Sequence, residues 1–347
     1  MRVTFIASPL TARSGVYRSA RELVEAGRDL ALDWELILGV SARAAGSPPP
    51  NDPTWVSELN AEPRGLRGVR SLARSLEQNV RVQQSDVLVS LVPQTDMALA
   101  RQAKPWVAYV RGLPWPARGE ANPAKALIWR HLETRALRTS RAVWATTEIL
   151  QAQLKPVDTT IVPAGIRPLT RSWDGRGSRN SVVWAARFDP DKRPALFADA
   201  LRGSELRGVM YGAGRLRDET TSSAPDNVRV AGWVEPDKLW ESALAYVGTS
   251  SREAFGRSAV EAAMNGIPVI LSENFGCANA LVTDLVFRKA FILDDDDPAV
   301  WRCALDKLAS DADLRERYSA HLARNASKIT IKSSAIAVAN QLAGIRV

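Results

Sequence analysis

The sequence is poor in cysteine and histidine. Its 347 residues include two cysteines, Cys277 and Cys303, and two histidines, His131 and His321. Two cysteines are too few for a disulfide framework, and they favour a reducing, cytoplasmic compartment. The absence of a Cys/His cluster argues against a zinc site, so metal-dependent chemistry would have to rest on carboxylates alone. We expect no bound metal and no cofactor.

Long hydrophobic runs are also absent. No uninterrupted apolar stretch has the length of a membrane-spanning helix. The apolar run that starts the chain breaks at Ser8-Pro9. It is too short for a signal-peptide core and is typical of a first strand. These features predict a protein that is soluble or peripheral on a membrane.

The length and net charge of the chain indicate the number of domains and the kind of partner. The chain is longer than a domain with a single hydrophobic core usually is, and its 46% hydrophobic residues are enough to fill two cores. The net charge is +8, of which +6 falls in residues 1–165, and this excess suggests an anionic partner. Nucleic acid, anionic lipid and phosphorylated small molecules all qualify. No nucleic-acid-binding motif is visible, so we do not expect a nucleic-acid partner.

Apolar runs of strand length alternate with stretches of helical period in both halves of the chain. We expect strands at 3–7, 34–40, 86–92, 106–110, 142–145 and 160–162, and then at 181–185, 207–211, 228–230, 245–247, 268–271 and 290–293. We expect helices at 16–26, 123–138, 194–201, 258–265 and 298–310. Continuous apolar strands separated by helices predict parallel sheets that are covered on both faces.

This pattern predicts two doubly wound, Rossmann-like α/β domains with a deep crevice between them, where the carboxyl ends of the strands would bind ligands. We assign residues 1–165 to an N-terminal domain and residues 166–329 to a C-terminal domain, both Rossmann-like. A C-terminal helix at about 330–347 is expected to pack back on the first domain. The Gly/Pro-rich segment 163–177 is the expected linker, and 46–53 is a surface loop.

The strongest local signal is a pair of glutamates, Glu253 and Glu261, at the start of an expected helix that Ser258 would cap. A helix N-terminus favours phosphate, and Gly256 would let the backbone approach such a ligand closely. A carboxylate can hold a ribose diol, which suits Glu261 and leaves Glu253 for sugar hydroxyls. The alternative is a pair of exposed helix-end glutamates.

Two cations follow the first expected strand of the second half. Arg187 leaves the end of that strand, and Lys192 is expected to open the next helix. A guanidinium and an ammonium at this edge suit a diphosphate. The alternative is a solvated turn.

The order of these residues resembles family 4 retaining glycosyltransferases, which have the GT-B fold. The matching segments are Ala186-Arg187 with Lys192, Tyr211-Gly212-Ala213-Gly214, Val230-Ala231-Gly232-Trp233-Val234, and the Glu-x7-Glu pair Glu253 and Glu261. The resemblance covers most of residues 180–310. It implies that the domain at 1–165 binds the acceptor and that the domain at 166–329 binds the nucleotide-sugar. It implies that Arg187 and Lys192 bind the donor diphosphate, Glu261 the ribose and Glu253 the donor sugar. Phe255, Gly256 and Gly212 would contribute backbone contacts around the donor.

The first half resembles the family more loosely. Ser14-Gly15-Val16 is similar to a Gly-Gly-Val turn, so Gly15 is a candidate donor contact, although Ser14 replaces one glycine. Arg111 stands where many members carry a histidine, so the histidine's role is not carried over. Arg111 would face a negative group on the donor or acceptor, or serve as a structural arginine.

The resemblance implies metal-independent, front-face transfer of a sugar from a UDP- or GDP-sugar to an acceptor hydroxyl, in glycan, glycolipid or cell-envelope polysaccharide synthesis. The nucleotide diphosphate would help to deprotonate the acceptor. One alternative is a nucleotide-sugar epimerase of the same fold. The other is a non-catalytic basic binding protein.

Two further segments call for interpretation. The acidic run at Asp294–Asp297 precedes Pro298, and we interpret it as a charged helix start in preference to a metal site. Residues 64–82 place Leu66, Val69, Leu72, Leu76 and Val80 at helical spacing, accompanied by Arg67, Arg70, Arg74 and Arg81. This segment is either a core-facing helix with a solvated arginine face or a surface that docks on anionic lipid near a lipid-linked acceptor.

Overall fold

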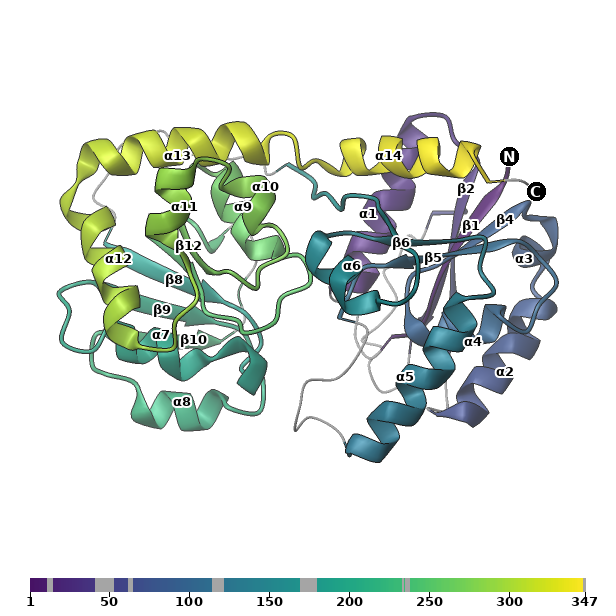
Figure 1. Ribbon diagram of the computed structural model, residues 1–347, viewed down its shortest axis with the longest axis horizontal. Coiled ribbons are helices and arrows are strands. Elements are labelled where there is room, and N and C mark those ends of the chain that lie inside the picture. The colour runs from purple at the N-terminus through teal and green to yellow at the C-terminus, as the bar shows by residue number, and fades with distance from the viewer. Residues whose placement is uncertain are drawn as a thin grey trace. The chain divides into compact units, whose positions relative to one another are not determined.

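The computed structural model describes residues 1–10, 15–40, 53–61, 65–113, 122–168, 180–232, 234 and 238–345 (Figure 1). The chain divides into two compact units. Met1–Arg167 and Ile331–Val347 form unit 1, and Pro168–Thr330 form unit 2. Most of the predicted loop at 46–53 and much of the predicted linker lie outside the described residues, as do Ser14 and Trp233. Within the described ranges, no helix combines the length and apolar character needed to cross a membrane.

Unit 1 contains one seven-stranded sheet in the order β3-β2-β1-β4-β5-β6-β7. The strands are β1 (Val3–Leu10), β2 (Trp34–Val40), β3 (Val56–Asn60), β4 (Val87–Ser90), β5 (Trp106–Val110), β6 (Ala142–Ala145) and β7 (Thr160–Ile161). All neighbouring strands are parallel, which confirms the predicted sheet type. Sequence reasoning missed β3 because this edge strand carries polar side chains, including Ser57, Glu58 and Asn60.

The described helices of unit 1 are α1 (Val16–Asp29), α2 (Leu66–Glu77), α3 (Val80–Gln84), α4 (Pro93–Leu99), α5 (Pro123–Leu137), α6 (Glu148–Leu154) and α14 (Ile331–Ala343). The C-terminal helix α14 lies beside α1 (Figure 1). Its apolar side chains Ile331, Ala335, Val338 and Leu342 join the buried core of this unit. The backbone N–H of Ile331 donates to the carbonyl of Ile166 at 2.7 Å, so the last helix is tied to the end of the first unit's main segment.

The predicted helix at 64–82 is two helices. α2 ends at Glu77, and the side chain of Asn79 caps α3 by accepting from the N–H of Arg81. α2 packs Val69, Ala73 and Leu76 into the core and exposes Arg67, Arg70 and Arg74. Arg81 is held by an ion pair with Glu35 at 3.2 Å. α2 therefore packs one face on the core and exposes its arginines on the other.

Two buried carboxyl groups belong to the helices that pack on one another beside α2. α4 contacts both α2 and α5, and it carries Asp96, whereas Glu133 belongs to α5. Both residues are 3% exposed. Burial raises the pKa of Asp96 to about 7. Burial, and then the charge of Asp96, raise the pKa of Glu133 to about 9, so Glu133 holds its proton at neutral pH.

Unit 2 contains a six-stranded parallel sheet in the order β10-β9-β8-β11-β12-β13. The strands are β8 (Ser181–Ala185), β9 (Arg207–Tyr211), β10 (Val228–Gly232), β11 (Ala243–Gly248), β12 (Val269–Ser272) and β13 (Ile292–Leu293). The described helices are α7 (Pro194–Ala200), α8 (Arg217–Ser223), α9 (Arg257–Met264), α10 (Ala278–Leu281), α11 (Leu285–Phe291), α12 (Pro298–Ser310) and α13 (Ala312–Ala326), with a 3-10 turn η1 (Pro190–Lys192).

Several predicted boundaries in unit 2 need correction. β13 is two residues long, because the predicted strand start belongs to α11. Lys192 ends the 3-10 turn η1, and α7 begins at Pro194. Asp297 caps α12 by accepting from the N–H of Ala299, which confirms the acidic run as a helix start. Cys277 and Cys303 are free thiols.

The order of the six strands creates one switch point. β8 lies between β9, which follows it in sequence, and β11, which comes later. The chain leaves the carboxyl ends of β8 and β11 in loops that run to α7 and α9, respectively. Ligands of doubly wound sheets bind where neighbouring strands diverge in this way. These two loops carry Lys192 and Glu253.

Candidate functional site

The loops after β8 and β11 are joined by backbone and hydroxyl contacts. The N–H of Ser251 donates to the carbonyl of Asp191 at 2.8 Å. The Thr249 hydroxyl donates to the carbonyl of Lys192 at 2.8 Å and accepts from the Trp184 indole at 3.0 Å. These contacts fix the position of the Lys192 backbone relative to the second loop.

Lys192 and Glu253 form a direct ion pair across these loops. The ammonium nitrogen of Lys192 lies 2.9 Å from Glu253 Oε2 and 3.2 Å from Asp191 Oδ2. It also donates to the carbonyl of Arg252 at 3.0 Å. The Lys192 side chain is 9% exposed, whereas that of Glu253 is 25% exposed. One buried cation thus lies between two carboxylates, of which Glu253 is the more open to solvent.

Glu261 has a partner that sequence reasoning missed. The Arg257 guanidinium donates through Nε to Glu261 Oε1 at 2.8 Å, one helical turn away. The side chain of Glu261 is 4% exposed, and that of Arg257 is 23% exposed. A carboxylate this deeply buried needs a charged partner, and Arg257 provides one. The signal was present in the sequence as an arginine four residues before Glu261.

Gly256 begins α9 in place of the predicted cap. The helix starts at Arg257, and Gly256 occupies the N-cap position with a φ of 95° and no capping side chain. A Cβ at Gly256 would lie 2.6 Å from the Phe275 ring and 2.9 Å from the Cys277 sulfur. The carbonyl of half-buried Phe255 accepts from the N–H of Cys277 at 2.7 Å. Packing against the loop after β12 therefore requires glycine here, apart from any ligand.

The Gly-x-Gly at 212–214 shapes the loop that carries Arg187. A Cβ at Gly212 would lie 1.9 Å from the carbonyl oxygen of Ala186, and one at Gly214 would lie 2.6 Å from the N–H nitrogen of Phe188. The N–H of Phe188 donates to the carbonyl of Ala213 at 3.0 Å. The glycines are thus needed for close contact between two backbone segments.

Arg187 has a different environment from Lys192. Its side chain is 71% exposed and forms an ion pair with Asp189 at 2.5 Å. The structure therefore brings Lys192 and Glu253 together, and pairs Arg187 with a residue of its own loop.

Gly15 and Arg111 lie in unit 1. Gly15 is the N-cap residue of α1 with a φ of 39°, and a Cβ there would meet no atom within 4 Å. Arg111 follows β5, with its guanidinium carbon 5.2 Å from the centroid of the Tyr109 ring. Burial raises the pKa of Tyr109, whose hydroxyl donates to the carbonyl of Val162 at 3.0 Å. Gly15 and Arg111 therefore both belong to unit 1, and their contacts given above are made within that unit.

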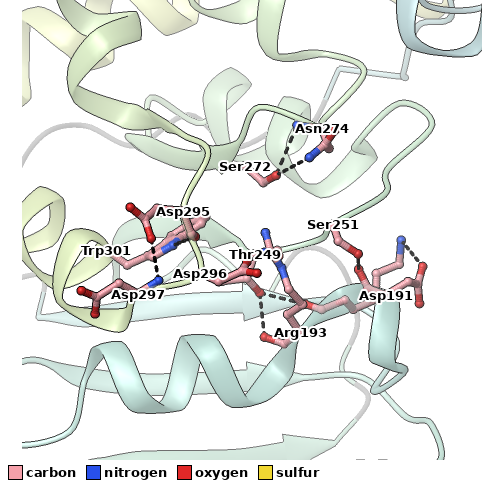
Figure 2. A network of polar contacts seen from close by, with 11 residues as sticks. Asp191, Arg193, Thr249, Ser251, Ser272, Asn274, Asp295, Asp296, Asp297 and Trp301 are labelled. Atoms are coloured by element: carbon pink, nitrogen blue, oxygen red, sulfur yellow. Dashed lines mark hydrogen bonds and ion pairs between the residues drawn. The ribbon is translucent and has the colours of Figure 1, made fainter. Parts of the chain in front are cut away.

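A second group of polar residues, also missed by sequence reasoning, supports the Lys192 loop. Figure 2 shows Arg193 beside Thr249, with Asp296 of the loop before α12 close to it. Arg193 has a φ of 49°, donates through Nε to the carbonyl of Thr249 at 2.5 Å and pairs with Asp296. The Trp301 indole donates to the carbonyl of Asp295 at 2.8 Å and holds the acidic loop. Asp296 of the acidic run therefore helps to hold Arg193, the neighbour of Lys192, in position.

The hydroxyl of Tyr246 lies in the same electrostatic environment as the two glutamates. Burial, followed by the charges of Glu253, Cys277 and Glu261, raises its pKa well above the usual value. Tyr246 therefore keeps its phenolic proton throughout the physiological range. Among the described residues, no cluster of three Cys, His, Asp or Glu side chains could hold a metal ion.

Comparison with known proteins places this geometry in context. Residues 170–324 match the family model described as "Glycosyl transferases group 1". A comparison of the sequence with curated proteins found no match. Three solved structures each align with 99% of this chain. HepE from Anabaena in complex with UDP and glucose is 14% identical, with 99% of that chain covered and a TM-score of 0.75. Sucrose-phosphate synthase from Thermosynechococcus elongatus is 15% identical, with 98% of that chain covered and a TM-score of 0.78, and WaaG, a glycosyltransferase involved in lipopolysaccharide biosynthesis, is 13% identical, with 100% of that chain covered and a TM-score of 0.70.

These similarities confirm the predicted architecture. The two parallel-sheet α/β units are those of GT-B glycosyltransferase structures. The family match falls on the unit that carries Lys192, Glu253 and Glu261. The chain thus has the GT-B fold, and its second unit matches the group 1 glycosyltransferases.

Proposed function

We propose that this protein is a retaining glycosyltransferase of the hexosyltransferase type. It moves a sugar from a nucleotide-sugar to an acceptor hydroxyl and requires no bound metal. The observation that carries the proposal is the Lys192–Glu253 ion pair at the switch point of the sheet whose unit matches a glycosyltransferase family. This pair offers a cation for a diphosphate and a carboxylate for sugar hydroxyls in one place.

Lys192 stabilises the leaving nucleoside diphosphate. The bond between the anomeric carbon and the diphosphate oxygen breaks, and negative charge collects on the diphosphate. An ammonium held in a fixed position lowers the energy of that charge without reorganising during the reaction. The ammonium has three N–H donors, and the structure directs them to Glu253, Asp191 and the carbonyl of Arg252. A phosphate oxygen therefore takes the place of one of these acceptors when the donor binds.

Glu253 receives the donor sugar. Its carboxylate is the more exposed member of the ion pair, and an ionised carboxylate can only accept hydrogen bonds. Two vicinal hydroxyls match two carboxylate oxygens. The acceptor hydroxyl then bonds to the anomeric carbon on the face that the diphosphate leaves, and its proton passes to a diphosphate oxygen. Front-face substitution of this kind retains the anomeric configuration.

Glu261 and Arg257 form the nucleoside side of the site. Arg257 holds the Glu261 carboxylate through Oε1, and we assign this carboxylate to the ribose diol. The exposed Arg187 closes on the diphosphate from the loop after β8. Phe255, Gly256 and Gly212 shape the backbone around the donor.

UDP-sugars lead the donor candidates, followed by GDP-sugars. HepE, whose fold this chain shares, has been solved with UDP and with UDP-glucose. We assign the acceptor to a glycan, glycolipid or cell-envelope polysaccharide under construction. WaaG, whose fold this chain shares, is a glycosyltransferase involved in lipopolysaccharide biosynthesis. Arg111 and Gly15 belong to the acceptor-binding unit of this scheme.

A panel of nucleoside diphosphates and nucleotide-sugars tests the proposal. We expect one nucleoside diphosphate to raise the melting temperature of the wild-type protein and its sugar conjugate to be consumed only when an acceptor is present. Consumption of the donor without any acceptor would indicate an epimerase. Stabilisation by every polyanion alike, with no turnover, would indicate a basic binding protein.

A further inference from the structure

The outward face of α5 does not have the residue distribution of an ordinary surface helix. Leu127 is 69% exposed and Ile128 is 59% exposed, whereas Glu133 on the opposite face is 3% exposed. A soluble helix normally buries its leucines and exposes its glutamates. Adjacent exposed Leu and Ile side chains at one end of a helix are therefore unexplained by the packing of unit 1.

The same face is strongly basic. Lys125, Arg130, Arg135 and Arg138 are exposed in or directly after α5, and the single acidic residue of the helix is the buried Glu133. A shallow hollow of about 510 Å³ runs along this face and is lined by Leu127, Arg130, His131, Thr134, Arg135 and Arg138. The surface thus combines two apolar side chains with a row of cations and presents no exposed carboxylate.

We infer that this face of α5 docks on a bilayer surface rich in anionic lipid. A helix lying in the interface buries apolar side chains between the lipid head groups and pairs its cations with lipid phosphates. A nucleic acid would use the cations but would gain nothing from Leu127 and Ile128. The combination of both residue types on one face therefore favours a lipid surface.

The position of α5 in the fold gives this surface a use. α5 connects the parallel strands β5 and β6, so it begins at the carboxyl edge of the sheet of unit 1. Leu127 and Ile128 lie in its first two turns. Docking through them holds the carboxyl edge of this unit, where its ligands would bind, against the membrane.

Helix α2 provides the comparison. It exposes three arginines, Arg67, Arg70 and Arg74, but its apolar stripe is buried and Leu66 is its one strongly exposed large hydrophobic side chain. Both helices therefore carry exposed arginines, whereas α5 alone of the two has an exposed apolar pair beside them. The sequence offered segment 64–82 as either a core-facing helix or a lipid-docking surface, and the exposed apolar pair places our lipid-docking proposal on α5 instead.

Vesicle sedimentation of the full-length chain tests the inference. The vesicles are phosphatidylcholine alone or an equimolar mixture with phosphatidylglycerol, each at low and moderate ionic strength. One variant carries Arg130→Gln, Arg135→Gln and Arg138→Gln. A second carries Leu127→Ser and Ile128→Ser, and the matched control carries Arg67→Gln, Arg70→Gln and Arg74→Gln, which removes the same charge from α2.

We expect the wild type to bind the anionic vesicles and not the neutral ones. The vesicle-binding constant of the α5 arginine variant should be lower than that of the wild type by about tenfold or more, because each arginine near an anionic surface contributes to the free energy of binding. The Leu127/Ile128 variant should lose binding even at moderate ionic strength, where the control still binds. Equal losses in the two arginine variants, or unchanged binding of the Leu127/Ile128 variant, would overturn the inference, as would preferential binding to single-stranded DNA.

The test is independent of the proposed enzymatic activity. All substituted side chains are exposed, so unchanged far-UV circular dichroism and melting temperature establish that the variants fold. Nucleoside diphosphate binding measured on the same variants should match the wild type. Loss of vesicle binding with intact nucleotide binding supports lipid docking, and failure of nucleotide binding in the wild type would affect only the proposed function.

Discussion

The ammonium nitrogen of Lys192 lies 2.9 Å from Glu253 Oε2, although the two residues are 61 positions apart in the sequence. The contact exists because β8 and β11 are neighbours in the sheet, so the loops that follow them start side by side. Hydrogen bonds from Thr249 and Ser251 then fix those loops to one another. The candidate site is thus a product of strand order.

Replacing Glu261 with Ala should weaken binding of the preferred nucleoside diphosphate by about 1–3 kcal/mol, the usual cost of losing a charged hydrogen-bond partner. The carboxylate is 4% exposed and is held by Arg257, so its position is fixed before the ligand arrives. Isothermal titration calorimetry measures the change. Glu316→Ala on α13 removes an exposed glutamate and should leave the affinity unaltered. Equal affinities for the wild type and Glu261→Ala would remove Glu261 from the nucleotide site.

Replacing Gly212 with Ala should destabilise unit 2 by about 3 kcal/mol or more, because the new methyl group collides with the backbone of the Arg187 loop. A Cβ at Gly212 would lie 1.9 Å from the carbonyl oxygen of Ala186, and the φ of Gly212 is 137°. Gly203→Ala is the matched control, since its φ is also positive, at 77°, but no atom lies within 4 Å of the added Cβ. Urea unfolding should show a much smaller loss for the control. Similar losses would mean that backbone conformation, and not this contact, requires the glycine.

The sequence allowed most of the fold to be predicted, because buried parallel strands are continuous apolar runs. The expected limits of Trp34–Val40 and Ser181–Ala185 agree with the structure. β3 was missed because an edge strand does not need apolar side chains on both faces. Among the site residues, Lys192 and Glu253 could be nominated from loop position, but their contact depends on strand order, which local patterns do not encode. Arg257 was visible as a helical neighbour of Glu261, whereas nothing local distinguishes Arg193 from a surface arginine.

The stability of unit 1 should fall as the pH rises from about 4.5 to about 9. The folded state holds a proton on Glu133, whose pKa is raised from 4.5 to about 9, whereas the unfolded chain releases it. The free energy of unfolding therefore decreases as the pH rises through this range. Asp96, with a pKa of about 7, acts in the same direction. Thermal unfolding at a series of pH values measures the slope.

Glu133→Gln should flatten this pH dependence, because the amide is neutral at every pH. The variant should raise the melting temperature at mildly alkaline pH more than at mildly acidic pH, because the wild type loses stability as the pH rises towards about 9. Glu77→Gln on the exposed face of α2 is the control and should keep the wild-type slope. A wild-type protein whose stability rises over this range would show that Glu133 is ionised in the folded state.

The transferred sugar should keep its anomeric configuration if the acceptor enters on the face that the diphosphate leaves. An α-linked nucleotide-sugar should therefore give an α-linked product. Proton NMR of the first product formed reads the anomeric coupling directly. A β-linked product would require the acceptor to attack the anomeric carbon from the face opposite the diphosphate, which would exclude the front-face scheme.

The most direct test of the central claim is calorimetric titration of the wild type, Lys192→Ala and Lys307→Ala with the preferred nucleoside diphosphate and its nucleoside. Lys307 is exposed in the last turn of α12, which begins at the carboxyl edge and runs away from it, so this variant controls for charge alone. If Lys192 binds the diphosphate, Lys192→Ala should lose about 1.5–3 kcal/mol of affinity for the diphosphate and little for the nucleoside. Lys307→Ala should bind both as the wild type does. Equal losses for diphosphate and nucleoside in Lys192→Ala, or no loss for either, would contradict the account.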